Sequence, residues 1–367
     1  MILRVINAIN TLQCAIFRGK PAQLRGFMKN FTVIGILVST LSVSIAHADS
    51  TKINGLYVNT FGDSSNPALI FVHGGPGDDS SNFEVTDATE LAAAGYFVAV
   101  YDERGQGRST YSSGMAAYNY STYSDDLMSI ISALNLKNPV LLAHSHGGSV
   151  AVHFDQKYPG VAKKIVLLDA PTNLWSLFSD MQTNCNRLFN QTGNAKGLAQ
   201  YTQDMQIVAK DEQGSSIQNL DELNTAVEDV FGLAMTCGQE GGLYYAKDAA
   251  STAVSDYTKA RQFFIQNVLP VIQTAPADLD PVKGFLANDN YVKVDFSDWV
   301  RKNQDHYYGI YGDEDGLFTP GTLSSISDQL GANINPIKFQ LIHGASHNVF
   351  IDQKELFNEA LKKVLKN

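Results

Sequence analysis

The chain has 367 residues, of which 44% are hydrophobic and 17% are charged. A chain of this length and composition buries a large core, as one enlarged domain or as two domains. The 27 basic and 37 acidic residues give a net charge of -10, and the later part of the chain has no basic cluster. This argues against nucleic acid as a partner, because phosphate binding requires concentrated positive charge.

The segment that starts at Met28 has the features of a secretory signal peptide. A short basic start precedes an apolar stretch at 31–45 and an A-x-A sequence at 46–48. We therefore expect cleavage after Ala48 and export to the periplasm or the medium, with residues 1–48 comprising the signal peptide and an upstream extension. The apolar stretch is shorter than the roughly 20 residues that span a bilayer, so no stable membrane insertion is expected after cleavage.

Beyond this segment, short apolar runs alternate with helical patterns, which is typical of a parallel sheet covered by helices on both faces. In the segment 123–134 the apolar residues recur at helical spacing, so one face of that helix is apolar. The predicted strands are 55–60, 68–72, 97–101, 140–143, 164–168, 306–311 and 337–342.

The sequence H-G-G-P-G at 73–77 directly follows a predicted strand. Its glycines allow backbone N–H groups to turn toward a developing oxyanion, so Gly74 or Gly75 is a candidate for an oxyanion hole. A tight turn built from turn-forming residues is the alternative.

Asp102 and Arg104 lie in the sequence D-E-R-G-Q-G-R-S, which follows the strand predicted at 97–101. Their charged groups are suited to strong hydrogen bonds within the loops at this edge of the sheet. We expect both residues to support the structure around a site rather than to react.

Ser145 lies between an apolar strand and a run of small residues that opens a helix. A serine held in such a sharp turn has a strained backbone and needs small neighbours, a demand that Ala143, Gly147 and Gly148 meet. The backbone N–H of His146 would then begin the helix close to the serine hydroxyl. Because Ala143 replaces the first glycine of the usual G-x-S-x-G pattern, this motif alone leaves open a plain Gly/Ser turn.

The alternation stops near Pro171 and resumes near His306. The intervening sequence reads as mostly helical and is rich in aromatic residues. Its position between two strands predicts a lid over the carboxyl ends of the sheet, where clefts of open α/β sheets lie. The expected organisation is a core formed by 49–170 and 303–367, with a helical cap domain at 171–302.

Cys185 and Cys237 are the two cysteines that remain after removal of the leader. An even pair in an oxidising compartment permits one disulfide. With so few thiols and no C-x-x-C spacing, no metal site is expected.

Two late segments complete a possible catalytic set. One is G-D-E-D-G at 312–316 and the other is H-G-A-S-H-N at 343–348, and each follows a predicted strand. The order serine, acid, histidine is that of an α/β-hydrolase triad. Asp315 is favoured over Asp313 because it lies further past its strand. His347 is favoured over His343 because it follows the loop 344–346, whereas we expect His343 to belong to the strand as a histidine of the core or of the shell around the site.

Taken together, the H-G-G-P-G pentapeptide, the D-x-R-G-x-G-x-S sequence, the serine elbow and the two late loops resemble the proline iminopeptidase family of α/β-hydrolases. The resemblance spans nearly the whole mature chain. It implies an α/β-hydrolase fold with an inserted helical cap, and the release of an N-terminal residue, often proline, from peptides. The site residues that it implies are Ser145, Asp315 and His347 as the triad, with Gly74 or Gly75 and His146 at the oxyanion hole.

The chain departs from the family where the serine is flanked by His144 and His146 rather than by glycine and tryptophan. The family binds the free amine of its substrate with acids contributed largely by the cap, and no local motif identifies these acids here. The candidates for substrate binding are the acids Glu222, Glu228 and Glu240 and the aromatic residues Trp175 and Tyr244.

The expected activity is that of a serine hydrolase that needs no cofactor or metal. Its expected substrates are small peptides with a free N-terminus, because an aromatic cap surface and a buried acid suit a pyrrolidine ring and its protonated amine. A carboxylesterase or lactonase acting on small esters is the enzymatic alternative, and a catalytically inactive binding module is the other. The sequence leaves the oligomeric state open.

Overall fold

The computed structural model describes residues 50–109, 114–212, 219–241, 251–274 and 280–367. The predicted signal peptide and its cleavage point therefore lie outside the described residues. A sheet of eight strands runs in the order β1-β2-β4-β3-β5-β6-β7-β8. The strands are β1 (Thr51–Ile53), β2 (Leu56–Phe61), β3 (Ala68–Val72), β4 (Phe97–Tyr101), β5 (Val140–His144), β6 (Lys164–Leu168), β7 (Tyr307–Gly312) and β8 (Phe339–Ile342).

The pairing confirms the expected mostly parallel sheet. All pairs from β4 to β8 are parallel, and β2 is antiparallel to both β1 and β4. All seven predicted strands form. The last one begins two residues later than predicted, at Phe339, because Pro336–Lys338 forms a 3₁₀ turn. The sequence pattern did not predict β1, a three-residue edge strand without buried residues.

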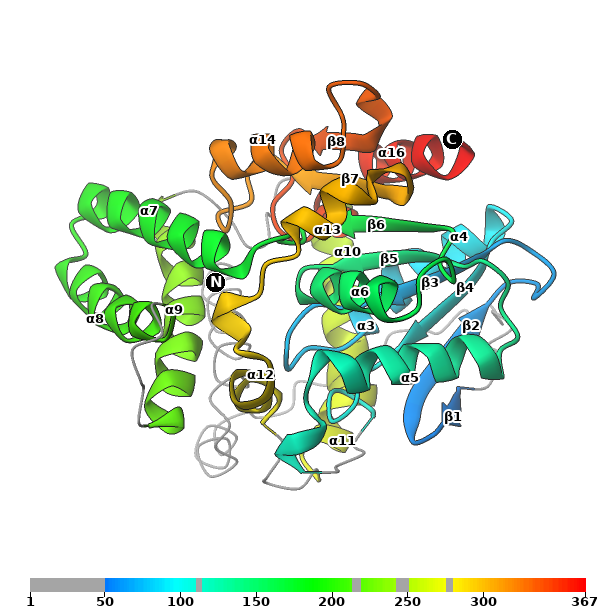
Figure 1. Ribbon diagram of the computed structural model, residues 1–367, viewed down its shortest axis with the longest axis horizontal. Helices are drawn as coiled ribbons and strands as arrows, with labels where there is room; N and C mark the ends of the chain where they lie inside the picture. The colour runs from blue at the N-terminus through cyan, green and yellow to red at the C-terminus, as the bar shows by residue number, and fades with distance from the viewer. Residues whose placement is uncertain (1–49, 110–113, 213–218, 242–250, 275–279) are drawn as a thin grey trace, which may run out of the picture.

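Helices cover both faces of the sheet (Figure 1). Side chains alternate between the faces, so Ile70 and Val72 of β3 join one apolar cluster, whereas Leu69 and Phe71 join the other. The first cluster includes residues of α5 (Tyr120–Ala133), α6 (His146–Lys157), α13 (Ser297–Lys302) and α14 (Pro320–Gln329). The second includes residues of α3 (Ser81–Phe83), α4 (Thr89–Ala93), α15 (Val349–Asp352) and α16 (Lys354–Lys366).

The segment between β6 and β7 is helical, as expected. Its first part is a group of three helices beyond the carboxyl ends of the strands, on the left of Figure 1. These are α7 (Leu174–Thr192), α8 (Ala195–Glu212) and α9 (Leu220–Gly241). The later helices are α10 (Ser251–Phe263), α11 (Leu269–Ile272) and α12 (Pro281–Asp289), of which α12 contacts α9 and α10 packs against α3 and α15 of the core.

Two short stalks, the first at 172–174 and the second at 294–296, connect the inserted segment to the core. Asn173 and Asp295 form an isolated antiparallel bridge. Beside it, the N–H of Leu174 donates to the carbonyl of Val294 at 2.8 Å, and the N–H of Phe296 donates to the carbonyl of Thr172 at 2.7 Å. The chain therefore leaves and re-enters the core at one place.

The disulfide between Cys185 and Cys237 is present and joins α7 to α9, with the two Cα atoms 5.4 Å apart. Replacing both cysteines with alanine should lower the free energy of unfolding by about 4 kcal/mol, because the bond closes a loop across a separation of 52 residues. Denaturant unfolding of the variant, with reduced wild-type protein as the control, measures the loss. Equal unfolding midpoints for the variant and the oxidised wild type would contradict this expectation.

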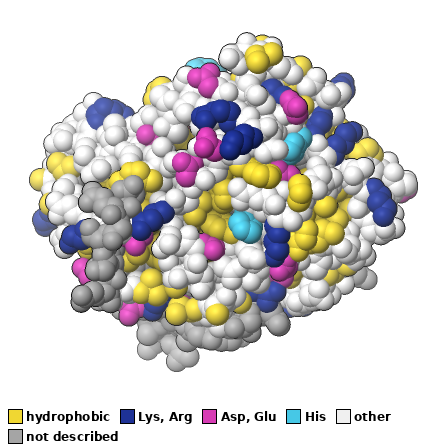
Figure 2. Space-filling model, viewed as in Figure 1, with side chains coloured by type: hydrophobic (Ala, Val, Ile, Leu, Met, Phe, Trp, Pro, Cys, Tyr) yellow, Lys and Arg dark blue, Asp and Glu magenta, His cyan; other side chains and the backbone are white. Residues whose placement is uncertain are grey.

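None of the helices within the described ranges is both long enough and apolar enough to cross a membrane. On the face shown in Figure 2, acidic and basic side chains are interspersed rather than gathered by sign.

Candidate active site

Ser145 occupies the sharp turn between β5 and α6. Its φ of 51° and ψ of -124° lie outside the usual regions for a residue with a side chain. A Cβ on Gly147 would lie 2.4 Å from the carbonyl oxygens of Val72 and His73, and a Cβ on Gly148 would lie 2.4 Å from the Cβ of Ala170. Glycine is therefore required at both positions, as the strand-turn-helix prediction anticipated.

His347 connects Ser145 to Asp315 through two hydrogen bonds. Its Nδ1 lies 2.8 Å from Oδ2 of Asp315, and its Nε2 lies 3.0 Å from Oγ of Ser145. Because a carboxylate accepts at Nδ1, this nitrogen carries the proton, and Nε2 is left to accept from the serine hydroxyl. Asp315 and His347 are both buried, and the N–H of Leu317 donates to the other oxygen of Asp315 at 2.9 Å.

The alternative acid and histidine pair with each other instead. His343 Nδ1 lies 2.6 Å from Oδ2 of Asp313, and the N–H of Gly344 donates to Oδ1 of Asp313 at 2.7 Å. The expectation that His343 is a buried strand residue was wrong. It follows the end of β8, and its side chain is 92% exposed, so the pair joins two loops at the surface.

The loop at 73–77 passes beside Ser145. A Cβ on Gly74 would lie 3.2 Å from the Cβ of Ser145, and Gly75 has a φ of +134° that favours glycine. His73 anchors the loop through two hydrogen bonds. Its Nε2 accepts the N–H of Glu103 at 2.9 Å, so its Nδ1 donates to the Gly74 carbonyl at 2.6 Å. The glycine loop and the N-terminus of α6 thus both lie next to the serine.

Asp169 completes the support of the triad, and the sequence reading missed it. The residue directly follows β6, is fully buried and has a φ of 45°. Its carboxyl accepts the N–H of Gly312 at 2.8 Å and the N–H of Val349 at 3.2 Å, so it joins the acid loop to the histidine loop. Burial raises its pKa well above the ordinary range, and the neighbouring Asp315 adds to the shift. Its position at a strand end was the signal that could have identified it.

The two histidines that flank Ser145 are buried and differ in their contacts. His144 Nε2 donates to the carbonyl of His347 at 2.8 Å, whereas the ring of His146 lies among Phe285, Tyr291 and Tyr120 at centroid distances of 4.8, 5.7 and 5.5 Å. Burial lowers the pKa of each histidine to about 3, so both stay neutral at pH 7.

His144 donates a hydrogen bond to the carbonyl of His347, and we predict that this bond positions the imidazole of His347. In a His144→Phe variant, which keeps a planar ring but lacks the donor, kcat should fall roughly fivefold, since one such bond contributes about 1 kcal/mol. His144→Gln, whose amide can donate, should retain more activity. Steady-state kinetics on both variants checks this, and an equal loss in the two would show that the donor is unimportant.

Asp102 and Arg104 both support loops, each with a partner that the sequence did not predict. Asp102 accepts from Arg108 Nε at 2.7 Å and from the Ser80 N–H at 2.9 Å. Burial alone would raise the pKa of Asp102, but Arg108 holds it below the ordinary value. Arg104 Nε donates to Asp126 in α5 at 2.9 Å.

The candidates for substrate binding in the inserted segment differ in their burial and in their contacts. Glu222 and Glu240 are exposed, and Glu240 accepts from Asn194 and Thr192 rather than lying with the triad. Trp175 of α7 is half-buried and packs against the first apolar cluster. Tyr244 lies outside the described residues.

Glu228 is half-buried, unlike the other two acids. Asn224 Nδ2 lies 3.3 Å from Oε1 of Glu228 and 3.2 Å from Oδ2 of Asp280, so one amide bridges two carboxyl groups. Burial raises the pKa of Glu228 to about 7, with a further contribution from Asp280.

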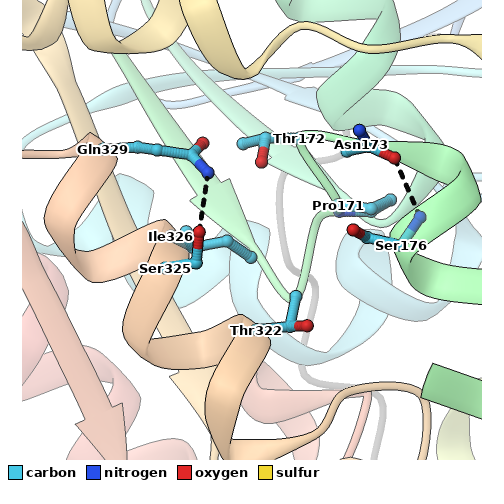
Figure 3. A pocket seen from close by; sticks show the side chains of 8 residues that line it. All are labelled: Pro171, Thr172, Asn173, Ser176, Thr322, Ser325, Ile326 and Gln329. Carbon is cyan, nitrogen blue, oxygen red and sulfur yellow. Dashed lines mark hydrogen bonds between the residues drawn. The ribbon is translucent and has the colours of Figure 1, made fainter. Parts of the chain in front are cut away.

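A small polar cavity of about 40 Å³ lies beside the first stalk, between α7 and α14 (Figure 3). Gln329 Nε2 donates to Ser325 Oγ at 3.3 Å on one wall, and Asn173 accepts the N–H of Ser176 at 2.8 Å on the other. No triad residue lines it, and its volume suits only a few water molecules. Within the described ranges, no group of three or more metal-ligating side chains is present.

The comparisons with known proteins agree with this geometry. Residues 67–354 match the family described as alpha/beta hydrolase fold. A proline iminopeptidase of Clostridium botulinum is 32% identical over 114 residues, which cover 31% of this chain and 38% of that protein. A putative esterase/lipase of Haemophilus influenzae is 31% identical over 103 residues, which cover 28% of this chain and 34% of that protein. The matched region therefore spans less than half the length of either relative.

A solved structure extends the likeness to the whole fold. The proline iminopeptidase-related protein of Thermus thermophilus superposes with a TM-score of 0.60 at 20% identity, covering 88% of this chain and 98% of that one. The eight-stranded sheet, the serine turn between β5 and α6, and the match over residues 67–354 lead to one conclusion. The chain belongs to the alpha/beta hydrolase fold family.

Proposed function

We propose that the protein is a serine hydrolase in which Ser145 is the nucleophile, His347 the general base and Asp315 the acid that orients the histidine. The observation that carries the proposal is the continuous chain of hydrogen bonds, 3.0 Å from serine to histidine and 2.8 Å from histidine to aspartate. Burial of the acid and the histidine supports it, because a water-poor site strengthens these charged interactions.

In the proposed reaction, Ser145 Oγ attacks the substrate carbonyl while its proton passes to His347 Nε2. Asp315 stabilises the resulting imidazolium. The N–H of His146, together with one from Gly74 or Gly75, binds the oxyanion. His347 then gives its proton to the leaving group, and water activated by the same histidine hydrolyses the acyl-enzyme.

For the substrate, we propose small peptides with a free N-terminus, including N-terminal proline. The Glu228 and Asp280 carboxyl groups support this class, because a protonated amine close to both would favour the ionised form of Glu228 and offset its burial. The likeness to proline iminopeptidases supports the same class.

A carboxylesterase or lactonase acting on small esters is the second candidate. The aromatic surroundings of His146, formed by Tyr120, Phe285 and Tyr291, favour it because they make the environment of the residue that follows the nucleophile apolar. The likeness to a putative esterase/lipase supports it too.

A panel of substrates separates the two candidates. Protein beginning at Asp49 should hydrolyse prolyl and other aminoacyl arylamides faster than N-blocked peptides or nitrophenyl esters. Glu228→Gln should raise KM for the aminoacyl substrates and leave ester hydrolysis unchanged, whereas Glu240→Gln is the matched control on the same helix. A preference for N-blocked substrates would reject the aminopeptidase class, and failure to label with a fluorophosphonate would reject the hydrolase in favour of a binding module.

We also propose that the protein is exported. The disulfide supports this, because such bonds persist in oxidising compartments. N-terminal sequencing of the mature protein should give Asp49 as the first residue, and a native N-terminus at Met28 would reject cleavage.

A further inference from the structure

Helix α10 belongs to the inserted segment, yet it packs against α3 and α15 of the core, behind the sheet in Figure 1. Two consecutive residues make the contact. The Asp256 carboxylate lies 3.6 Å from Lys354 Nζ, and the Tyr257 hydroxyl donates to Oδ1 of Asp352 at 2.9 Å. The inserted segment therefore contacts the core directly behind the loop that carries His347.

Asp352 transmits this contact to the histidine loop. Its second oxygen, Oδ2, accepts the N–H of Ser346 at 2.9 Å and also the Ser346 hydroxyl. Asp352 is 1% exposed and Ser346 is fully buried, so water does not compete for these bonds. Ser346 directly precedes His347 in the chain. One carboxylate thus holds the phenol of the inserted helix and the backbone of the loop together.

The two ends of the histidine loop have different anchors. Asp169, directly after β6, holds the N–H of Val349 at 3.2 Å on the far side of His347. Asp352 holds Ser346 on the near side and depends on Tyr257 for its other oxygen. The inserted segment is therefore connected to the near side through Asp352, and the Tyr257 phenol also has a hydrogen bond with Asn348, directly after His347.

We propose that Tyr257 is a positioning residue for catalysis, which acts through Asp352 to hold the His347 imidazole in line with Ser145. The inference rests on the proposed hydrolase function and adds to it a role for the inserted segment in the chemical step. The phenol suits the task because it stays a hydrogen-bond donor: burial and the adjacent Asp352 raise the pKa of Tyr257 well above its ordinary value. Without this donor, the buried carboxylate of Asp352 has one hydrogen bond fewer, and it shifts toward other hydrogen-bond donors.

Tyr257→Phe tests the role because it removes only the hydroxyl. We expect kcat to fall roughly tenfold with KM within twofold, since a bond to a charged acceptor is lost but no substrate contact is. Asp256→Asn is the matched control at the neighbouring position: it weakens the contact with Lys354 and should leave kcat unchanged. A fall in kcat of the same size in Asp256→Asn would overturn the proposal, because both variants would then act through helix docking alone.

A double-mutant cycle tests the route. In an Asp352→Asn background, Tyr257→Phe should have a smaller effect on kcat than in the wild type, because the amide has one acceptor oxygen and can no longer hold the phenol and the Ser346 N–H as the carboxylate does. Additive losses would overturn the route through Asp352.

Hydrogen exchange of the loop 343–349, followed by mass spectrometry, adds a readout that needs no turnover. The loop should exchange faster in Tyr257→Phe than in the wild type or in Asp256→Asn. Unchanged exchange would overturn this inference, whereas a wild-type protein with a protected loop but no turnover would overturn the proposed function instead.

Discussion

Ser145→Ala is expected to lower kcat by about 10⁶, the loss typical of removing the nucleophile from a serine triad. The effect is this large because neither His347 nor Asp315 can supply a nucleophile, so only the oxyanion contacts and substrate binding remain. The fold should persist, since alanine fits the turn between β5 and α6 at least as easily as serine. Turnover and fluorophosphonate labelling of purified protein measure the change.

Ser176→Ala is a matched control for this variant. Its side chain lines the small cavity beside the first stalk, away from the triad, so it should keep wild-type activity. If a correctly folded Ser145→Ala protein turned over substrate at a rate near that of the wild type, the assignment of the nucleophile would be wrong.

Asp315→Asn is expected to lower kcat by roughly 10⁴, as amide substitution of a triad acid does elsewhere. The amide can donate to Nδ1 of His347, which favours the tautomer with its proton on Nε2, and this nitrogen could then no longer accept from Ser145. The substitution is nearly isosteric, so the loss should appear in kcat rather than in stability. Kinetics and thermal unfolding on the same preparation separate the two.

The matched control for the acid is Asp313→Asn, two residues away in the same loop. Asp313 contacts His343, whose side chain lies 92% exposed, so its amide variant should retain nearly full kcat. If Asp313→Asn lost activity and Asp315→Asn did not, Asp313 rather than Asp315 would be the acid that orients the histidine. Two aspartates of one loop thus give a direct test of the hydrogen bonds that define the site.

The fold and the reacting groups could be predicted because local patterns encode them. Apolar runs of about five residues marked the strands, and polar residues just beyond them marked Asp315 and His347. Since the carboxyl ends of parallel strands meet at one edge of a sheet, residues far apart in sequence were expected to lie together. The small residues around Ser145 identified the strained turn.

Choices among similar residues were harder for the substrate site than for the triad. Glu222, Glu228 and Glu240 have the same side chain on one helix, and only packing distinguishes the half-buried Glu228 from the exposed other two. The local sequence around each glutamate carries no mark of its burial. Which acid is held next to a second carboxyl group was therefore decided by the position of α12, which brings Asp280 to Glu228.

The amino-acid pattern was sufficient to predict the fold family, the chain order of Ser145, Asp315 and His347, and the need for small residues around the serine turn. The partners of the buried polar groups became clear only from the packing: Asp102 with Arg108, Arg104 with Asp126, and Tyr257 with Asp352 across 95 residues. The physical reason is the distance along the chain between the residues that interact. Strand patterns and turn chemistry arise from neighbours in the chain, whereas a buried hydrogen bond forms with whichever partner the packing brings within about 3 Å.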